Sequence, residues 1–306
     1  MQPVIHRIHL PLRSPLRTAI GDIRERTVWL VNIGSGWGEA APLPGFGGES
    51  PELCELALDR ARSGVEPSAA TPCAFAAVEG ARLDHAARQA GKPLAGVTGS
   101  VATNRLARSD SEALGGGTVK LKSSGDPVAD AARMRSLRAR EPGLRLRLDA
   151  NGSWDRAGAH AFARLAGSLV EYVEQPLPSS DLAGCAELRR AGLRVALDES
   201  IRGQDGLARA AAIGACDVVV LKPNWLGGWA ATAALTAMAR LAGIEVILSS
   251  ALGSAVERAH AAHLALSLGL AGPHGLATGS LLTRDVGTFD PALIGGQPGL
   301  GFAVTP

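Results

Sequence analysis

TVKLK at residues 118–122 is the first of six short apolar runs that each end in a polar, mostly charged residue. One strand, one helix and two loops fill the 24 to 28 residues between successive run ends, which predicts consecutive βαβ units. Such units build a (β/α)8 barrel, whose active site lies at the carboxyl ends of its strands. The pattern therefore predicts an enzyme with six side chains on one rim. They are Lys122, Asp149, Glu174, Asp198, Lys222 and Ser250.

The repeat extends to eight strand candidates, joined by alanine-rich segments with helical spacing that end in glycine. The candidates are SVATN, TVKLK, LRLRLDAN, LVEYVEQP, RVALDES, DVVVLKP, EVILSS and HGLATG. Before them come two strand-like stretches and then helical periodicity from about residue 51 to residue 91. The sequence thus predicts the α/β class, with a (β/α)8-type barrel at residues 96–290. An N-terminal α+β capping domain is expected at 1–95, and residues 291–306 are expected to return to it.

Composition excludes several classes of protein. The 306 residues are 46% hydrophobic and carry a net charge of +2, which favours a globular chain with no nucleic-acid or membrane partner. The four cysteines show no CxxC spacing and are expected to be free thiols in a reduced, cytoplasmic interior. Neither a signal peptide nor an apolar run of ~18 residues is evident. A small-molecule substrate is the expected partner, and the oligomeric state is left open.

Three carboxylates, Asp149, Glu174 and Asp198, end consecutive predicted strands. Carboxylates on one rim repel one another unless a cation lies among them, and oxygen ligands suit a hard ion such as Mg²⁺. Taken singly, Asp149 or Asp198 would serve equally well as the N-cap of the following helix. Glu174 shares their register but is a poor N-cap, so the three together favour a metal site.

Lysines end two of the predicted strands. Lys120 and Lys122 are two residues apart, so their side chains share one face of a strand. Inside a barrel an unpaired ammonium is costly, so both are expected beside anions, and a solvent-facing edge strand is the alternative. Lys222 ends the buried run DVVVL and is expected across the barrel mouth, with a lone surface lysine as the alternative. Ser250 is expected to offer its hydroxyl to a substrate carboxylate.

Two other motifs are interpreted as structural. Glu257, His260 and His263 have helical spacing that imitates a zinc site, but their register is that of an outer barrel helix, which favours ordinary packing. GSGWG at residues 34–38 lies between strands and does not lead into a helix, which disfavours a dinucleotide-binding loop.

KLK, DAN, EQP, DES and LKP at these intervals resemble the enolase superfamily, in its branch with lysines on the second and sixth barrel strands. GWGEAAPLPGFGGES at 36–50, RLDAN at 147–151 and the pair Lys222–Pro223 are similar to the o-succinylbenzoate synthases within it. This resemblance covers nearly the whole chain. One departure is the seventh-strand loop SSALGSAVE, where that family is expected to have an acidic residue near position 253 and a glycine near position 257.

The resemblance implies a Mg²⁺-dependent dehydratase of menaquinone biosynthesis, acting on a small carboxylate, with Mn²⁺ as a substitute metal. It implies that Asp149, Glu174 and Asp198 hold the metal. Lys122 would act as base and then as acid, with Lys120 and Lys222 as the other catalytic lysines. The residues expected to bind the substrate are Arg147, Asn151 and Ser250.

Other functions stay open. An N-succinylamino acid racemase or dipeptide epimerase of the same superfamily would need the same charged residues, with Lys222 as a second acid/base. A metal-free Schiff-base lyase would use Lys122 or Lys222 as nucleophile, but it leaves the three carboxylates without a role. A non-catalytic binding barrel is a further alternative. A loop of the cap near Arg17 to Thr27 and the loops after the seventh and eighth strands are expected to contact the substrate side chain and to select the substrate.

Overall fold

The computed structural model describes residues 1–306 except 19, 20, 108 and 114, and it divides into two compact units. Unit 1 comprises residues 1–103, 222–234 and 248–306. Unit 2 comprises residues 104–221 and 235–247. Both units are assembled from separate stretches of the chain, so they do not follow the expected division at residues 95 and 290. Those domain boundaries stay a prediction.

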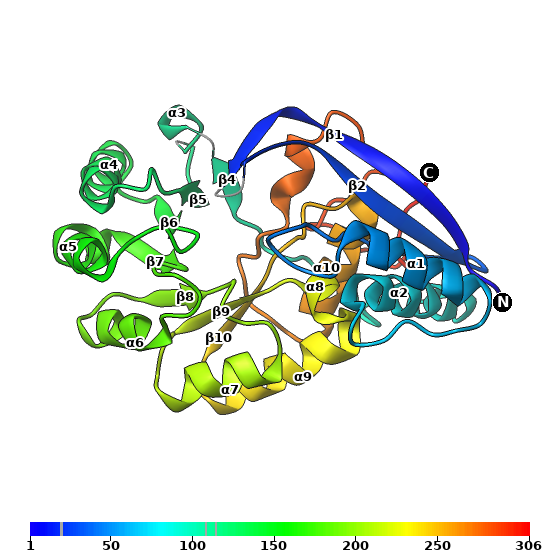
Figure 1. The fold of residues 1–306 in the computed structure, drawn as a ribbon. Helices are drawn as coiled ribbons and strands as arrows, with labels where there is room; N and C mark the ends of the chain where they lie inside the picture. The colour runs from blue at the N-terminus through cyan, green and yellow to red at the C-terminus, as the bar shows by residue number, and fades with distance from the viewer. Residues whose placement is uncertain (19–20, 108, 114) are drawn as a thin grey trace. The chain divides into compact units, whose positions relative to one another are not determined.

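Unit 1 begins with a three-stranded antiparallel sheet in the order β1-β2-β3 (Figure 1). The strands are β1 (Val4–Thr18), β2 (Gly21–Ile33) and β3 (Gly36–Ala40). The strand-like stretches at the start of the chain are therefore confirmed. Most of the segment Arg17–Thr27, expected to be a loop, belongs to the β1–β2 hairpin, and its residues 19 and 20 lie outside the described residues.

Two helices follow the sheet, within the stretch from about residue 51 to residue 91 where the sequence showed helical periodicity. They are α1 (Pro51–Arg62) and α2 (Pro72–Gln89). The Ser50 side chain caps α1, and the connection to α2 contains Gly64, whose φ of +88° is left-handed, and then Pro67. Because a left-handed residue cannot continue an α-helix, the helical periodicity is interrupted there.

The glycines of GSGWG let β3 approach α2 closely. A Cβ added at Gly36 would lie 2.1 Å from the backbone oxygen of Ala81, and one at Gly38 would lie 1.9 Å from that of Ala77. Neither distance is tolerable for a real Cβ, so only glycine fits at these two positions. These contacts give the motif a role in packing β3 against α2.

The remainder of unit 1 comes from the second half of the chain. It contains α8 (Pro223–Leu226), the first part of α9 (Gly228–Leu241), α10 (Ala255–Ser267) and the 3₁₀ helix η2 (Ala277–Leu281). The C-terminal segment runs back along α2 and the residues that follow it. The Leu94 amide donates to Gly299 O at 2.8 Å, and the Leu300 amide donates to Asp84 Oδ1, within α2, at 2.7 Å. Buried residues of β1, β2 and α10 form one of its cores.

Unit 2 holds a seven-stranded sheet in the order β10-β9-β8-β7-β6-β5-β4, in which β4 to β9 pair in parallel. Six of its strands lie where the sequence placed them. The strands are β4 (Arg105–Ala107), β5 (Thr118–Lys122), β6 (Arg145–Asp149), β7 (Val170–Glu174), β8 (Val195–Leu197), β9 (Val218–Leu221) and β10 (Glu245–Leu248).

The first and eighth predicted strands differ from expectation. The first strand is β4, directly after SVATN. HGLATG forms no strand of its own, since it makes two isolated parallel bridges, Thr103 to His274 and Ser249 to Gly275, before η2 begins. Along the chain, Thr103 lies two residues before β4 and Ser249 directly follows β10.

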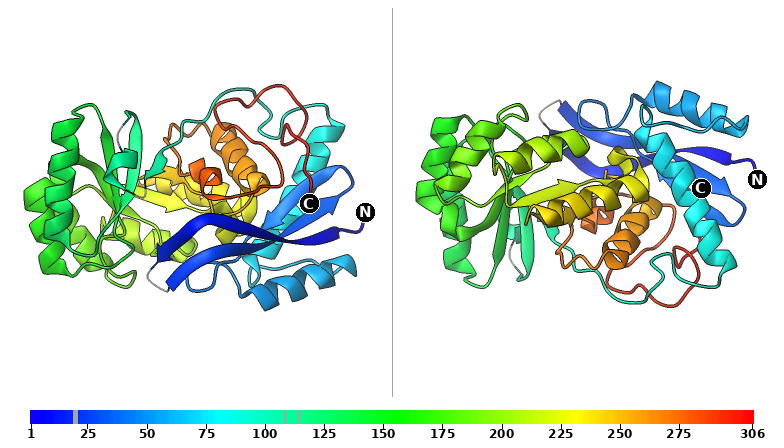
Figure 2. Two further views of the ribbon diagram at one scale, coloured as in Figure 1. Left: turned by 90° about the horizontal axis from the view of Figure 1, so that it is seen from above. Right: turned by 90° about the horizontal axis from the view of Figure 1, so that it is seen from below.

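Helices α4 to α6 stand in a row along one face of this sheet (Figures 1 and 2). The helical elements of unit 2 are α3 (Asp110–Ala113), α4 (Pro127–Arg140), α5 (Arg156–Ala166), the 3₁₀ helix η1 (Gly167–Leu169), α6 (Leu182–Arg190), α7 (Gln204–Ala212) and the end of α9. Aspartates cap α4, α5 and α6 by accepting from backbone amides of the first turn. The alternation of strands and helices predicted from the repeat is confirmed.

All four cysteines are free, as the sequence predicted, and the structure shows that they are buried. Within the described ranges, every helix is too short or too polar to cross a membrane.

Candidate active site

The carboxyl ends of β5, β6 and β7 in unit 2 bring Lys122, Asp149 and Glu174 together. In the parallel register Lys122 pairs with Asp149, and Asp149 pairs with Glu174. Asp198 comes directly after β8, and Lys222 comes directly after β9. Because the strands are parallel, their ends meet at one edge, which is where barrel enzymes carry their active sites.

Lys120 is the buried cation of this cluster. Its Nζ lies 2.6 Å from Glu174 Oε1 and 2.8 Å from Asp149 Oδ2, and only 14% of its side chain is exposed. Burial by itself would lower the pKa of Lys120, but the carboxylates of Asp149, Glu174 and Asp198 raise it well above its usual value. Since β5 lies between β4 and β6, the edge-strand alternative is wrong.

Lys122 is the more accessible lysine, with 39% of its side chain exposed. Its Nζ donates to Asp149 Oδ2 at 2.7 Å and to Asn151 Oδ1 at 2.6 Å. The Asn151 amide nitrogen in turn donates to Glu199 Oε1 at 2.9 Å. The amine is thus oriented by two acceptors while remaining open to a reactant.

Asp149 and Glu174 are almost completely buried, with 1% of each side chain exposed. Burial raises the pKa of Asp149, but the nearby Lys120 and Lys122 ammonium groups outweigh it and hold that pKa well below its usual range. Neither Asp149 nor Asp198 caps a helix, because α5 is capped by Asp155 and α7 begins after Gly203. The N-cap alternative is therefore wrong.

The donor chemistry of these carboxylates fits a hard divalent ion. As they stand, no three His, Cys, Asp or Glu side chains in the described residues form a metal-binding group. Lys120 accounts for this, because its ammonium group forms ion pairs with the carboxylates of both Asp149 and Glu174. A metal ion bound at this edge would compete with Lys120 for the two carboxylates, and the ligand set stays a prediction.

Arg147 lies inside the sheet's packing rather than at its open edge. It is fully buried, and its Nε and Nη2 pair with the two carboxylate oxygens of Glu171 at 2.9 and 3.1 Å. Its Nη1 donates to Asn104 Oδ1 at 3.1 Å, and the guanidinium lies 4.8 Å from the Tyr172 ring centroid. Arg147 pairs with Lys120 in the parallel register of β5 and β6, and a substrate contact by Arg147 stays a prediction.

Unit 1 carries the other two predicted site residues, Lys222 and Ser250. Lys222 is the N-cap residue of α8, and its Nζ lies 5.0 Å from the ring centroid of Trp225. The Ser250 hydroxyl lies 2.7 Å from Thr278 Oγ1 and accepts from the Leu252 amide at 2.9 Å. Ser250 is buried, so its role toward a substrate also stays a prediction.

The helix that imitates a zinc site is a packing element. Residues 255–265 of α10 are all buried. His260 Nε2 lies 2.8 Å from Trp37 O, and His263 Nδ1 accepts from the Ala95 amide at 3.1 Å. Burial lowers the pKa of His263 to about 4, which keeps the ring neutral. Ordinary packing was the expectation for this motif, and these contacts agree with it.

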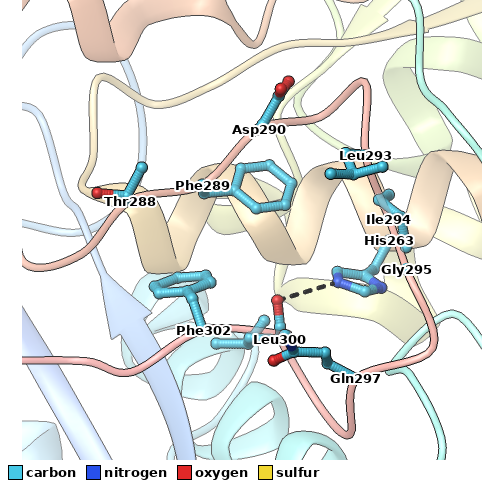
Figure 3. Close-up of a pocket in the computed structure, with 11 residues that line it drawn as sticks. His263, Thr288, Phe289, Asp290, Leu293, Ile294, Gly295, Gln297, Leu300 and Phe302 are labelled. Carbon is cyan, nitrogen blue, oxygen red and sulfur yellow. Dashed lines mark hydrogen bonds between the residues drawn. The ribbon is translucent and has the colours of Figure 1, made fainter.

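His263 also borders a cavity of about 250 Å³ between α10 and the C-terminal segment (Figure 3). Its walls include Phe289 and Phe302, whose ring centroids are 6.0 Å apart. None of the predicted site residues lines this cavity.

Sequence reasoning missed two residues beside the predicted ones. Glu199 orients Asn151, and Trp225 lies against Lys222. Both follow a predicted strand end closely, within DES at 198–200 and LKPNW at 221–225. Their closeness in sequence to a predicted strand end was therefore the one signal that could have indicated these two residues. That closeness does not show which side chains point toward the site.

A parallel βα sheet with lysines and carboxylates at its carboxyl edge defines a barrel enzyme of acid–base chemistry. Residues 102–306 match the family described as Enolase C-terminal domain-like, and the chain belongs to the enolase superfamily.

Relatives with different activities are similarly close to this chain. It is 34% identical to an o-succinylbenzoate synthase of Thermobifida fusca over 292 residues, covering 91% of this chain and 82% of that protein. It is 32% identical to an L-Lys-D/L-Arg epimerase of Methylococcus capsulatus over 300 residues, covering 85% and 84%. The crystal structure of a dipeptide epimerase from Methylococcus capsulatus, complexed with Mg and the dipeptide L-Arg-D-Lys, matches with a TM-score of 0.84 at 28% identity, covering 98% of each chain.

Proposed function

We propose that this protein is an o-succinylbenzoate synthase. It removes water from 2-succinyl-6-hydroxy-2,4-cyclohexadiene-1-carboxylate by a syn elimination and releases 2-succinylbenzoate, a step of menaquinone biosynthesis. The proposal draws on GWGEAAPLPGF at 36–46 and on Lys222–Pro223, the motifs similar to that family. The 34% identical synthase of Thermobifida fusca supports it.

The observation that carries the chemistry is the difference between the two lysines of β5. Lys120 is buried and bound by two carboxylates, whereas Lys122 is more exposed and oriented by Asp149 and Asn151. A general base has to reach its substrate and be held in a fixed position, and of these two amines Lys122 is the one that meets both conditions. We therefore assign the base to Lys122 and a structural, charge-balancing role to Lys120.

In the proposed reaction Lys122 Nζ takes the proton from the carbon that bears the substrate carboxylate. The electrons of that C–H bond form the new C=C bond as the C–O bond of the neighbouring hydroxyl breaks. Lys122 then returns its proton to the departing hydroxyl, and water leaves. Mg²⁺, held by Asp149, Glu174 and Asp198, would supply Lewis-acid stabilisation of the developing negative charge. Lys222 contributes a fixed positive charge.

A second candidate is a dipeptide epimerase or N-succinylamino acid racemase. The 32% identical L-Lys-D/L-Arg epimerase and the epimerase of known structure favour it. That reaction needs Lys222 to exchange a proton with the reacting carbon, whereas the elimination needs only its charge.

One experiment separates these functions. The purified protein with Mg²⁺ is assayed for dehydration of the cyclohexadiene carboxylate, and for α-deuteration of N-succinylamino acids and dipeptides in D₂O. We expect the highest kcat/KM for dehydration. A higher kcat/KM for any dipeptide or N-succinylamino acid would overturn the proposal, and undiminished activity after exhaustive chelation would favour the metal-free lyase.

A further inference from the structure

Three hydrogen bonds fasten the one-turn helix α8 to the end of β3 and to Ala41, which follows it. Asn224 Nδ2 donates to Glu39 O at 2.6 Å, and Asn224 Oδ1 accepts from the Ala41 amide at 2.8 Å. Trp225 Nε1 donates to Ala41 O at 3.0 Å. These bonds satisfy backbone groups at the end of β3 and just beyond it, and they fix Asn224 and the Trp225 indole, two and three residues after Lys222.

The loop after β3 also holds the Trp225 ring from one side. Leu43 and Gly47 exchange two backbone hydrogen bonds of 3.0 Å, which close the loop on itself. A Cβ added at Gly47 would lie 2.3 Å from Trp225 Cε3 and 2.4 Å from Cδ2. The backbone at Gly47 is therefore in direct contact with the indole, and a side chain there would displace the ring.

Lys222 uses the same indole. Its Nζ lies 5.0 Å from the ring centroid, within the range of a cation–π contact. The two residues are three apart at the start of a helical turn, the spacing at which side chains meet. The Trp225 amide also donates to Lys222 O at 3.0 Å, so the turn itself holds the pair together.

We propose that Trp225 is a positioning residue, which holds the Lys222 ammonium against a ring fixed by the loop at Gly47 and thereby favours elimination over racemisation. This inference rests on the proposed function. An elimination uses Lys222 as a stationary charge, whereas racemisation requires its Nζ to reach the reacting carbon. A contact that restrains the ammonium serves the first reaction and opposes the second.

Four variants separate the parts of this arrangement. Trp225→Leu removes the aromatic face, and Trp225→Phe keeps it while losing the hydrogen bond to Ala41. Gly47→Ala displaces the ring without substituting Lys222 or Trp225. Gly296→Ala is the matched control, because a Cβ there would meet nothing within 4 Å. Circular dichroism verifies the fold of each variant before it is used.

The first readout needs no substrate. The rate at which acetic anhydride labels Lys222 is measured by mass spectrometry in the full-length protein, relative to the exposed Lys92. Trp225→Leu and Gly47→Ala should change the relative rate about 2- to 30-fold, the range of a cation–π contact, and Trp225→Phe should change it least. Gly47→Ala should have little further effect in the Trp225→Leu background, because its action passes through the ring. Equal labelling in all variants would overturn the proposal.

The second readout is the ratio of α-deuteration of N-succinylamino acids to dehydration. It should rise in Trp225→Leu and be restored in Trp225→Phe, with the loss in dehydration appearing in kcat rather than in KM. An unchanged ratio would overturn the claim on reaction preference. Changed labelling in a protein that performs no dehydration would instead leave Trp225 as a positioning residue and refute the proposed function.

Discussion

Lys122 Nζ and the side-chain oxygen of Asn151 lie 2.6 Å apart, and Glu199 determines which end of the amide faces the lysine. A carboxylate accepts hydrogen bonds only, so Glu199 takes the Asn151 nitrogen and leaves the oxygen for Lys122. Asn151 has a φ of +45°, a left-handed conformation that asparagine tolerates better than most residues. Backbone and side chain together therefore direct this oxygen to the base.

We predict that Asn151→Gly lowers kcat about 10-fold or more, because a hydrogen bond to a charged group is worth ~1.5–3 kcal/mol. Glycine keeps the left-handed backbone, so the melting temperature should change little. Asn151→Ala adds backbone strain and should lower the melting temperature as well. Steady-state kinetics and thermal unfolding measure the two effects. A wild-type kcat in Asn151→Gly would mean that Asp149 alone orients Lys122.

Glu174→Gln should cost several kcal/mol of transition-state stabilisation, the scale of Lewis-acid catalysis, because it removes a charged metal ligand. Calorimetric titration with Mg²⁺ or Mn²⁺ should show weaker binding by the variant, and kcat should fall with it. Glu187→Gln is the control, since Glu187 pairs with Arg156 at the surface. Wild-type turnover by Glu174→Gln at saturating Mg²⁺ would refute the metal site.

The strand ends could be predicted because their signal is local and repeated. Each of β5 to β10 has an apolar run, a polar terminus and a helix at a regular interval, and these features depend on neighbours in sequence. The first and eighth predicted strands, SVATN and HGLATG, were placed less accurately, because neither has this full pattern. HGLATG contributes only two bridge residues, although its sequence resembles that of a strand.

The supporting residues of the site depend on contacts between distant parts of the chain. Trp225 bonds to Ala41 across 184 residues, and Asn151 bonds to Glu199 across 48. No periodicity in the sequence links such pairs. A single sequence therefore predicts that Lys222 and Lys122 lie at strand ends, but it does not show which side chains orient them. The break between α1 and α2 was missed for another reason. Apolar residues continue at helical spacing on both sides of Gly64, and periodicity alone does not detect one left-handed residue.

Glu257 predicts a pH dependence of stability. Its Oε1 accepts from the Ala251 amide at 3.0 Å, and its Oε2 is buried without a hydrogen-bond partner among the described residues. Burial, and then the negative charge of Glu39, raise the pKa of Glu257 to about 7. The folded state therefore binds this proton more tightly than the unfolded state does. The stability contributed by protonation of Glu257 is fully present below pH ~4.5 and is lost as the pH rises through about 7.

We predict that Glu257→Gln removes this loss, because the amide cannot ionise. Its free energy of unfolding relative to wild type should rise between pH 5 and pH 8, by up to ~3 kcal/mol. Denaturant unfolding at several pH values provides the measurement. Glu66→Gln, at an exposed glutamate paired with Arg82, should show no comparable trend. Parallel stability curves for wild type and Glu257→Gln would show that Glu257 is ionised throughout.

Substitutions of Lys122 and Lys222 should separate dehydration from racemisation. Lys122→Ala should abolish both reactions, because it removes the proposed base, and general base catalysis alone is typically worth ~10² to 10⁴-fold. Lys222→Arg should keep a measurable part of the dehydration rate, since arginine retains the positive charge.

Any racemase side activity should disappear in Lys222→Arg, because a guanidinium cannot act as a base at accessible pH. Both rates are measured on one preparation, dehydration by product formation and racemisation by α-deuteration in D₂O, so that differences in folding cancel in their ratio. Equal losses of the two activities would mean that Lys222 transfers protons in both reactions or that the site requires the shape of lysine. In either case the assignment of Lys222 as a stationary charge would have to be withdrawn.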